Sequence, residues 1–130
     1  MQTSGTRKRS VARATIKPGK GSVKINSIPL PLFEPAYLRM RISEALLLAG
    51  KASETVDIAV RVAGGGINGQ ADATRLAIGR AMVAFSKDDK IKTSYLEYDR
   101  TLLVADVRRK EMSKPNCRGK ARRKRQKSYR

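Results

Sequence analysis

The sequence predicts a small two-layer α/β sandwich, with about four strands in a mixed sheet and helices on one face, followed by an extended basic tail. Residues 55–62 alternate apolar and polar side chains, which is typical of a strand with one buried face. Residues 70–85 carry apolar side chains at helical spacing. Residues 108–130 hold 12 Lys or Arg and one acid, Glu111, with almost nothing apolar to bury. We therefore expect residues 1–107 to form one globular domain and residues 108–130 to be a tail that is disordered when unbound.

The first half of the chain joins strand patterns through turn residues. Short runs of alternating apolar residues predict strands, and Gly and Pro mark the breaks between them. After Pro35, apolar residues at helical spacing predict a helix that stops at Gly50. A break near Met40 stays open, because Ser43 is able to cap a second helix. The expected elements are strands at 10–16 and 22–25, an extended stretch at 28–33, and a helix with Pro35 in its first turn that stops at Gly50.

The second half of the chain contains the clearest patterns. The strand at 55–62 leads through a glycine-rich loop at 63–69 into the helix at 70–85. Ser86 to Asp89 resembles a capping box for a short helix that reaches about Glu97. Tyr98 to Val104 is predicted to be a last strand.

The charge of the chain points to a polyanionic partner. The 29 Lys and Arg exceed the 11 Asp and Glu by 18, and residues 1–107 alone carry 17 basic and 10 acidic side chains. Arg7, Arg9 and Arg13 share one parity, so we expect a row of cations along the outward sheet face, unless this is an ordinary solvated face. We expect no signal peptide and no membrane span, because the longest apolar run, 45–49, is far too short.

The glycine-rich loop superficially matches two nucleotide-binding motifs. Gly64, Gly66 and Gly69 fit the dinucleotide fingerprint, and Asp88 follows at about the required distance. Asp88, however, lies in a polar stretch rather than at the end of a second parallel strand. The phosphate-loop motif needs Lys and Ser or Thr directly after the last glycine, where this chain has Gln70 and Ala71. Both alternatives are therefore disfavoured.

A simpler role remains for this loop. A glycine-rich turn at a helix N-terminus exposes backbone N–H groups and the positive end of the helix dipole, which suits a nucleic-acid phosphate. The alternative is that the glycines only make a tight turn. Catalysis and metal binding are not expected, since the chain has no His, one Cys (Cys117) and scattered acids. We predict no enzyme activity, no cofactor and no small-molecule substrate.

Five segments in order carry a resemblance to a known family: TRKRSVARA, GKGSVKINSIPL, VAGGGINGQADATRLAIGRAM, YDRTLLVADVRRKE and KARRKRQKSYR. The chain resembles, along nearly its whole length, the ninth protein of the small ribosomal subunit in its archaeal and eukaryotic form. The resemblance implies a four-stranded sheet with a left-handed βαβ crossover, against the usual rule. It also implies a cytoplasmic ribosomal protein, with small-subunit rRNA of the head, neighbouring head proteins and the P-site tRNA as partners.

The family resemblance, together with the charge pattern, predicts specific contact residues. The expected rRNA contacts are Arg7, Lys8, Arg9, Arg13, Gly64, Gly65, Gly66, Gln70, Arg80, Arg100, Arg108, Arg109, Lys110, Lys120, Arg122, Arg123, Lys124 and Arg125. The residues expected near the tRNA are Lys127, Ser128, Tyr129 and Arg130. The bacterial branch ends in Ser-Lys-Arg where this chain has Ser-Tyr-Arg, so the terminal arginine is retained and the penultimate contact differs. Tyr129 would either stack on a base or stay solvated.

Two other classes of protein fit the charge less well. A DNA-packaging protein would have no use for the glycine loop. A membrane-active basic peptide needs an amphipathic cationic helix, which Pro115, Gly119 and the lack of apolar spacing in the tail disfavour.

Overall fold

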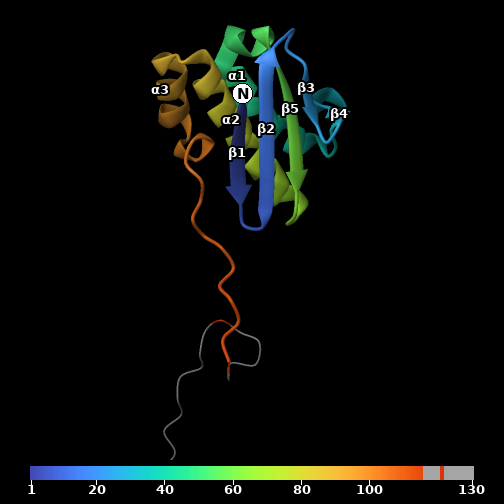
Figure 1. Ribbon diagram of the computed structural model, residues 1–130, viewed down its shortest axis with the longest axis vertical. Helices are drawn as coiled ribbons and strands as arrows, with labels where there is room; N and C mark the ends of the chain where they lie inside the picture. The colour runs from blue at the N-terminus through green and yellow to red at the C-terminus, as the bar shows by residue number, and fades with distance from the viewer. Residues whose placement is uncertain (116–120, 122–130) are drawn as a thin grey trace, which may run out of the picture.

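The computed structural model describes residues 1–115 and 121 and contains a five-stranded mixed sheet (Figure 1). The strand order is β1-β2-β5-β3-β4, in which only β3 and β5 are parallel neighbours. The strands are β1 (Gln2–Arg7), β2 (Ser10–Pro18), β3 (Val23–Ile25), β4 (Ile28–Pro29) and β5 (Val56–Ala63).

Helices cover one face of this sheet, which confirms the predicted α/β sandwich (Figure 1). They are α1 (Ala36–Ala49), α2 (Ile67–Ser86) and α3 (Asp89–Tyr98), with 3₁₀ turns η1 (Leu30–Leu32), η2 (Gly50–Thr55) and η3 (Arg100–Leu102). The helix α2 packs against β1 and β2, and α1 lies beside it. In residues 1–115, no helix has the length and hydropathy to cross a bilayer.

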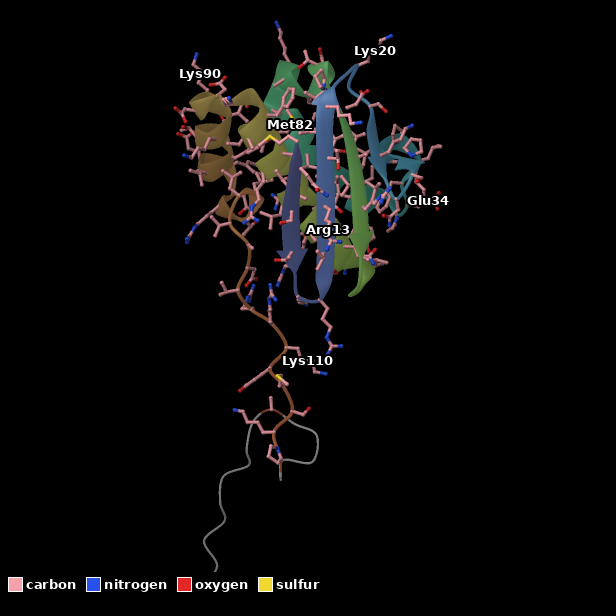
Figure 2. The ribbon with its side chains drawn as sticks, viewed as in Figure 1. Arg13, Lys20, Glu34, Met82, Lys90 and Lys110 are labelled. Atoms are coloured by element: carbon pink, nitrogen blue, oxygen red, sulfur yellow. The ribbon has the colours of Figure 1, made fainter. Side chains whose placement is uncertain are left out.

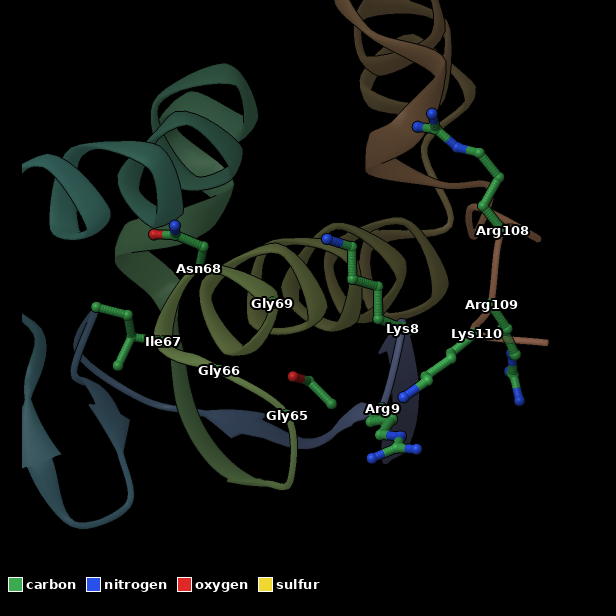
Figure 3. A pocket seen from close by; sticks show the side chains of 11 residues that line it. Lys8, Arg9, Gly65, Gly66, Ile67, Asn68, Gly69, Arg108, Arg109 and Lys110 are labelled. Carbon is green, nitrogen blue, oxygen red and sulfur yellow. The ribbon is translucent and has the colours of Figure 1, made fainter. Parts of the chain in front are cut away.

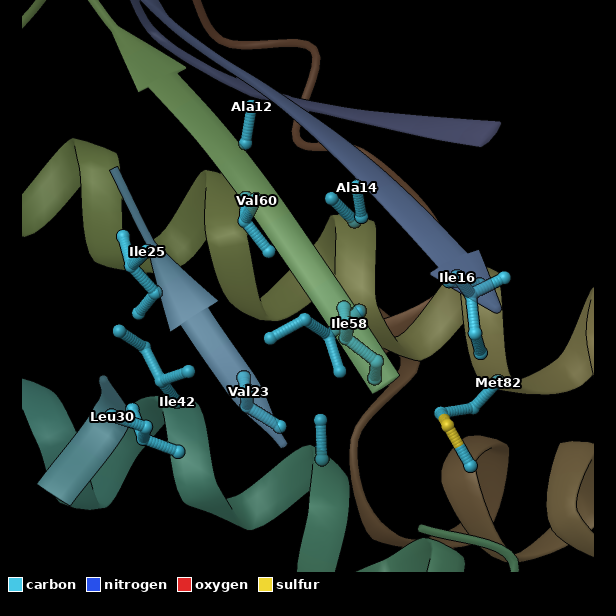
Figure 4. Close-up of a cluster of buried hydrophobic side chains, with 14 of the residues drawn as sticks. Ala12, Ala14, Ile16, Val23, Ile25, Leu30, Ile42, Ile58, Val60 and Met82 are labelled. Carbon is cyan, nitrogen blue, oxygen red and sulfur yellow. The ribbon is translucent and has the colours of Figure 1, made fainter. Parts of the chain in front are cut away.

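The core lies between the helices and the inward side chains of β2 and β5 (Figure 4). Ala14 and Ile16 on β2 and Val60 on β5 are at most 1% exposed, whereas the adjacent strand residues Arg13 and Arg61 are exposed. The predicted alternation is therefore confirmed: one sheet face is buried and the other is open to solvent.

The first strand, β1, was not predicted, because its inner face carries small and polar residues instead of large apolar ones. The Thr3 hydroxyl donates to the carbonyl of Ala77 on α2 at 2.9 Å. A Cβ on Gly5 would lie 2.3 Å from the carbonyl oxygen of Ala73, so this edge strand approaches α2 at backbone distance. Glycine permits that approach, and the usual hydrophobic signal is absent.

The strand β1 shows that the predicted row of Arg7, Arg9 and Arg13 on the outward sheet face is wrong for its first two members. Lys8 and Arg9 form the turn between β1 and β2, and Arg7 pairs with Ser10 in the register. Ser10 belongs to the buried parity of β2, so Arg7 lies on the helix-covered side of the sheet, whereas Arg13 lies on the open side.

The last predicted strand, 98–104, is also wrong. The helix α3 continues through Tyr98, and the Asp99 carboxylate accepts a hydrogen bond from the Thr101 N–H at 2.8 Å, which starts η3. Leu102 is fully buried in the helical layer, where a Cβ on Gly79 of α2 would lie 2.6 Å from its carbonyl oxygen. This segment therefore packs against the helices instead of forming a strand of the sheet.

The helices follow the predicted pattern with shifted details. The helix α1 runs unbroken to its C-cap at Gly50, so the optional break near Met40 does not occur. The helix α2 starts at Ile67, three residues before the predicted start, and α3 is capped by Asp88, not Ser86. The parallel strands β3 and β5, joined through α1, form a βαβ unit. The left hand of its crossover stays a prediction of the family resemblance.

The helix α2 is buried on more sides than its apolar stripe alone predicts. Arg75, a charged residue of this helix, is only 6% exposed. Its guanidinium contacts Glu44 of α1 at 2.8 Å and Asp99 at 3.0 Å. The sheet, α1 and η3 together enclose α2, so Arg75 is buried although it is charged. Its two carboxylate partners compensate the cost of burying that charge.

Candidate nucleic-acid interface

An open hollow of about 730 Å³ lies where three separate segments meet (Figure 3). The β1–β2 turn, the first turn of α2 with the loop before it, and the root of the tail all contribute. The lining residues are Lys8, Arg9, Ser10, Gly65, Gly66, Ile67, Asn68, Gly69, Arg108, Arg109 and Lys110. Five of these are cationic and none is acidic, so the hollow has a positive potential.

Two glycines of the loop are required by the fold. Gly64 and Gly65 have φ angles of 77° and 65°, which disfavour any residue with a side chain. A Cβ on Gly65 would also lie 2.2 Å from the hydroxyl oxygen of Ser10. That buried hydroxyl donates to the Gly64 carbonyl at 3.0 Å, and the Gln70 amide donates to the same carbonyl at 3.1 Å. The loop is thus fastened to the start of β2 and fixes the position of α2 relative to the basic turn.

Gly66 differs from its two neighbours. Its φ of −110° is ordinary, and a Cβ there would have no atom within 4 Å. It is the N-cap of α2, yet it has no side chain to bond the first N–H groups, and the first turn contains no acid. The first N–H groups of a helix have no intrahelical acceptor and carry the positive end of its dipole. This end of α2 therefore suits an anion from outside the helix.

An ion-pair cluster fixes the root of the tail beside the hollow. Arg7 contacts Asp106 at 3.1 Å and Asp72 at 3.6 Å, and Arg41 contacts Asp72 at 2.8 Å. Hydrogen bonds from Arg108, above all from its side chain, lower the pKa of the Asp106 carboxyl to about 2. The Asp106 carboxylate binds both Arg7 and Arg108, which directs the following residues along the hollow (Figure 3).

The structure divides the predicted rRNA contacts into three groups. Lys8, Arg9, Gly65, Gly66 and residues 108–110 meet around the hollow. Those placed elsewhere are Arg7 in the ion-pair cluster, Gly64 in the loop, Gln70 in the first turn of α2, Arg13 on the open sheet face, Arg80 between β1 and the segment after η3, and exposed Arg100 in η3. Lys120, Arg122, Arg123, Lys124, Arg125, Lys127, Ser128, Tyr129 and Arg130 lie outside the described residues.

Arg80 has a clear structural task. Its guanidinium donates to the carbonyl of Leu103 at 2.9 Å and to the carbonyl of Ser4 at 2.9 Å. It thereby joins the edge strand β1 to the chain that leads into the tail.

Four lining residues were not among the individually predicted contacts, although the last three belong to the predicted loop at 63–69: Ser10, Ile67, Asn68 and Gly69. Asn68 and Gly69 have low helix propensity, so the sequence pattern placed the start of α2 at residue 70 instead of residue 67. The Asn68 side chain accepts a hydrogen bond from the Tyr37 hydroxyl at 3.2 Å, a contact across 31 residues that no local pattern contains. The detectable signal was Gly66 itself, since glycine is accepted as an N-cap.

The dinucleotide alternative is wrong for this fold. After α2 the described chain continues into α3 and η3, and no strand follows to pair in parallel with β5. Asp88, the residue that would contact a ribose, instead caps α3 by accepting from the Lys90 N–H at 2.9 Å. Residues 1–115 and 121 contain no group of three or more potential metal-ligating acids or cysteines.

Comparison with known proteins gives a consistent result. A family model described as ribosomal protein S9/S16 matches residues 5–130. Small ribosomal subunit protein uS9 of Methanococcus maripaludis (strain C7) is 49% identical over 131 residues, covering 100% of this chain and 98% of that protein. The protein of the same name from Methanothrix thermoacetophila is 48% identical over 130 residues, with the same coverage.

These matches confirm the family resemblance drawn from the sequence motifs, including its archaeal type. They also confirm that the role is structural and not enzymatic, since the matched family consists of ribosomal proteins. The chain belongs to the ribosomal protein S9/S16 family.

Proposed function

We propose that this protein is a structural component of the small ribosomal subunit that binds rRNA in the subunit head, with residues 108–130 extending to the P-site tRNA. The observation that carries the rRNA part is the convergence of the basic β1–β2 turn, the uncapped start of α2 and the tail root around one hollow. The family and the names of its relatives support the assignment to this subunit.

The hollow fits an RNA backbone better than a base. Its charged groups are Lys and Arg, which neutralise phosphates, and the uncapped N-terminus of α2 adds backbone donors for an anion. Such contacts position a protein on RNA without reading sequence. Within the subunit the partners would be head rRNA, neighbouring ribosomal proteins and the P-site tRNA.

The salt dependence of rRNA binding tests the first part of this proposal. If about eight phosphates are neutralised, the log–log slope of affinity against salt concentration should be about −6 to −7. Filter binding or fluorescence anisotropy of the full chain with head rRNA, between 0.05 and 0.3 M salt as rough limits, measures this slope. A slope close to zero would contradict binding through phosphates.

Removal of the last four residues, Lys127 to Arg130, tests the tRNA part. We expect small subunits assembled with the truncated chain to keep normal composition but to bind P-site tRNA less tightly. The loss should be about five- to eightfold at 0.1 M salt for each of the two cations that contacts a phosphate. Unchanged tRNA affinity in fully assembled particles would rule out this part and leave the rRNA part standing.

A further inference from the structure

The open face of the sheet carries a second group of cations, which does not line the hollow. Arg13 of β2 lies directly opposite Arg61 of β5 in the antiparallel register, and both are exposed. On the neighbouring strand β3, exposed Lys24 lies opposite Ala59, which is two residues from Arg61 on the same face. Three strands thus present positive charge side by side.

The arginine pair works against the stability of the isolated domain. Like charges directly opposite each other on adjacent strands are destabilising. Within residues 1–115 and 121, neither Arg13 nor Arg61 forms a salt bridge. An arrangement that costs stability without an internal partner indicates that an external anion neutralises it.

The one acidic side chain among the strand residues of this face is committed elsewhere. Asp57 accepts hydrogen bonds from the N–H groups of Lys20 at 3.0 Å and Ser22 at 2.9 Å, in the turn between β2 and β3. The Ser22 bond is the main cause of the lowered pKa of Asp57, with the nearby Lys24 charge contributing less. Asp57 therefore holds the turn and leaves the arginine pair uncompensated.

The shape of this face favours an RNA backbone. A hollow of about 510 Å³ runs across the strands, and short side chains such as Thr15 and Ala59 lie between its cations. Asp57 also lines it, at the end near the β2–β3 turn. Its lining contains no aromatic ring on which a base would stack. Figure 2 shows Arg13 on the strand face turned away from the helices, so the described helical layer does not cover it.

We infer that the open sheet face, centred on Arg13, Arg61 and Lys24, binds phosphates of an RNA backbone that crosses β2, β5 and β3. This inference rests on the proposed rRNA binding and adds a second surface to it. The turn residue Arg9 at the end of β2 lines the first hollow, so the two surfaces lie at the end and on the face of one strand. That continuity favours RNA over an acidic protein segment as the occupant.

Affinity for head rRNA, measured with the full chain, tests this inference. The double variant Arg13→Gln/Arg61→Gln should bind roughly 25- to 60-fold more weakly at 0.1 M salt, because each lost phosphate contact removes about five- to eightfold. The log–log salt slope should become shallower by about 1.4 to 1.8. The charge-matched control is Lys51→Gln/Lys90→Gln, which removes two exposed cations from other parts of the surface and should have little effect.

A second variant separates RNA binding from folding. Arg61→Glu turns the repulsive pair with Arg13 into an attractive one, so the melting temperature of the RNA-free protein should rise by a few degrees at low salt. Its rRNA affinity should nevertheless fall at least as far as that of the double glutamine variant. Lys90→Glu, which changes the net charge equally, should leave the affinity close to that of the unaltered chain.

Each result decides between named explanations. If the Arg13/Arg61 variants bind normally while Lys8→Gln/Arg9→Gln binds weakly, the sheet-face inference is overturned and the proposed function stands. If the unaltered chain fails to bind head rRNA, both are overturned. If affinity for naked rRNA is unchanged but the variants no longer assemble with neighbouring ribosomal proteins, the face binds an acidic protein and the RNA inference is wrong.

Discussion

Replacing Lys8, Arg9, Arg109 and Lys110 together by glutamine is expected to weaken binding to head rRNA by roughly 600- to 4000-fold at 0.1 M salt. All four line the hollow, and none of them forms a salt bridge within the described residues. Each phosphate contact contributes about 0.7 to 0.9 to the log–log salt slope, so its loss costs about five- to eightfold at this salt concentration. The slope should become shallower by about 3.

A matched variant controls for the change in net charge. Lys51, Lys87, Lys90 and Lys92 are also exposed but do not line the hollow, and their replacement by glutamine removes the same number of positive charges. We expect that control to retain most of the affinity. Equal losses in the two variants would mean that affinity depends on total charge alone, and the hollow would then have no special role. Circular dichroism should show that both variants remain folded, because all eight side chains are exposed.

Arg7 was left out of that variant because the structure gives it a different task. Its guanidinium is shared between Asp106 and Asp72, so its charge is already compensated within the domain. Arg108 contacts Asp106 as well, at 2.7 Å, although it also lines the hollow. A basic residue in a predicted binding segment can thus either contact RNA or form an ion pair within the domain. Only the positions of the acidic residues in the folded structure distinguish these two roles.

This distinction shows where sequence reasoning was sufficient and where it was not. Local periodicity predicted β2, β3, β5, α1 and α2, because each of these elements carries apolar residues at the spacing of its own geometry. The family resemblance and the charge pattern, and not periodicity, predicted contacts near the start of the chain, in the glycine loop and at the tail root, and the structure places residues of all three segments around one hollow.

The failures have one physical cause: contacts between segments that are distant in the sequence. The strand β1 packs against α2 through Thr3 and Gly5. It has no alternating apolar residues from which a strand could be predicted. The segment after Tyr98 contains strand-forming residues, yet burial of Leu102 over Gly79 places it with the helices. The parity of Arg7 could not be determined without β1, because the two-residue turn reverses the chain and sets which face it takes.

A substitution in the glycine loop is expected to change the stability of the protein and its affinity for rRNA in opposite directions. Gly66→Asp should stabilise the RNA-free protein by about 0.5 to 1 kcal/mol, because aspartate is a better N-cap than glycine and interacts favourably with the dipole of α2. The position accepts a side chain, since its φ is ordinary and the space beside it is open. Thermal or urea unfolding of the full chain measures this gain.

The same substitution should weaken rRNA binding by roughly 30- to 150-fold, since a carboxylate would stand where the phosphate is proposed to lie, at a cost of about 2 to 3 kcal/mol. Gly66→Asn is the matched control, because asparagine caps a helix about as well but carries no charge. Its affinity should lie between those of the unaltered chain and the aspartate variant. A stabilised Gly66→Asp protein that binds rRNA normally would show that the start of α2 faces no phosphate, and the glycine loop would then serve only to join β5 to α2.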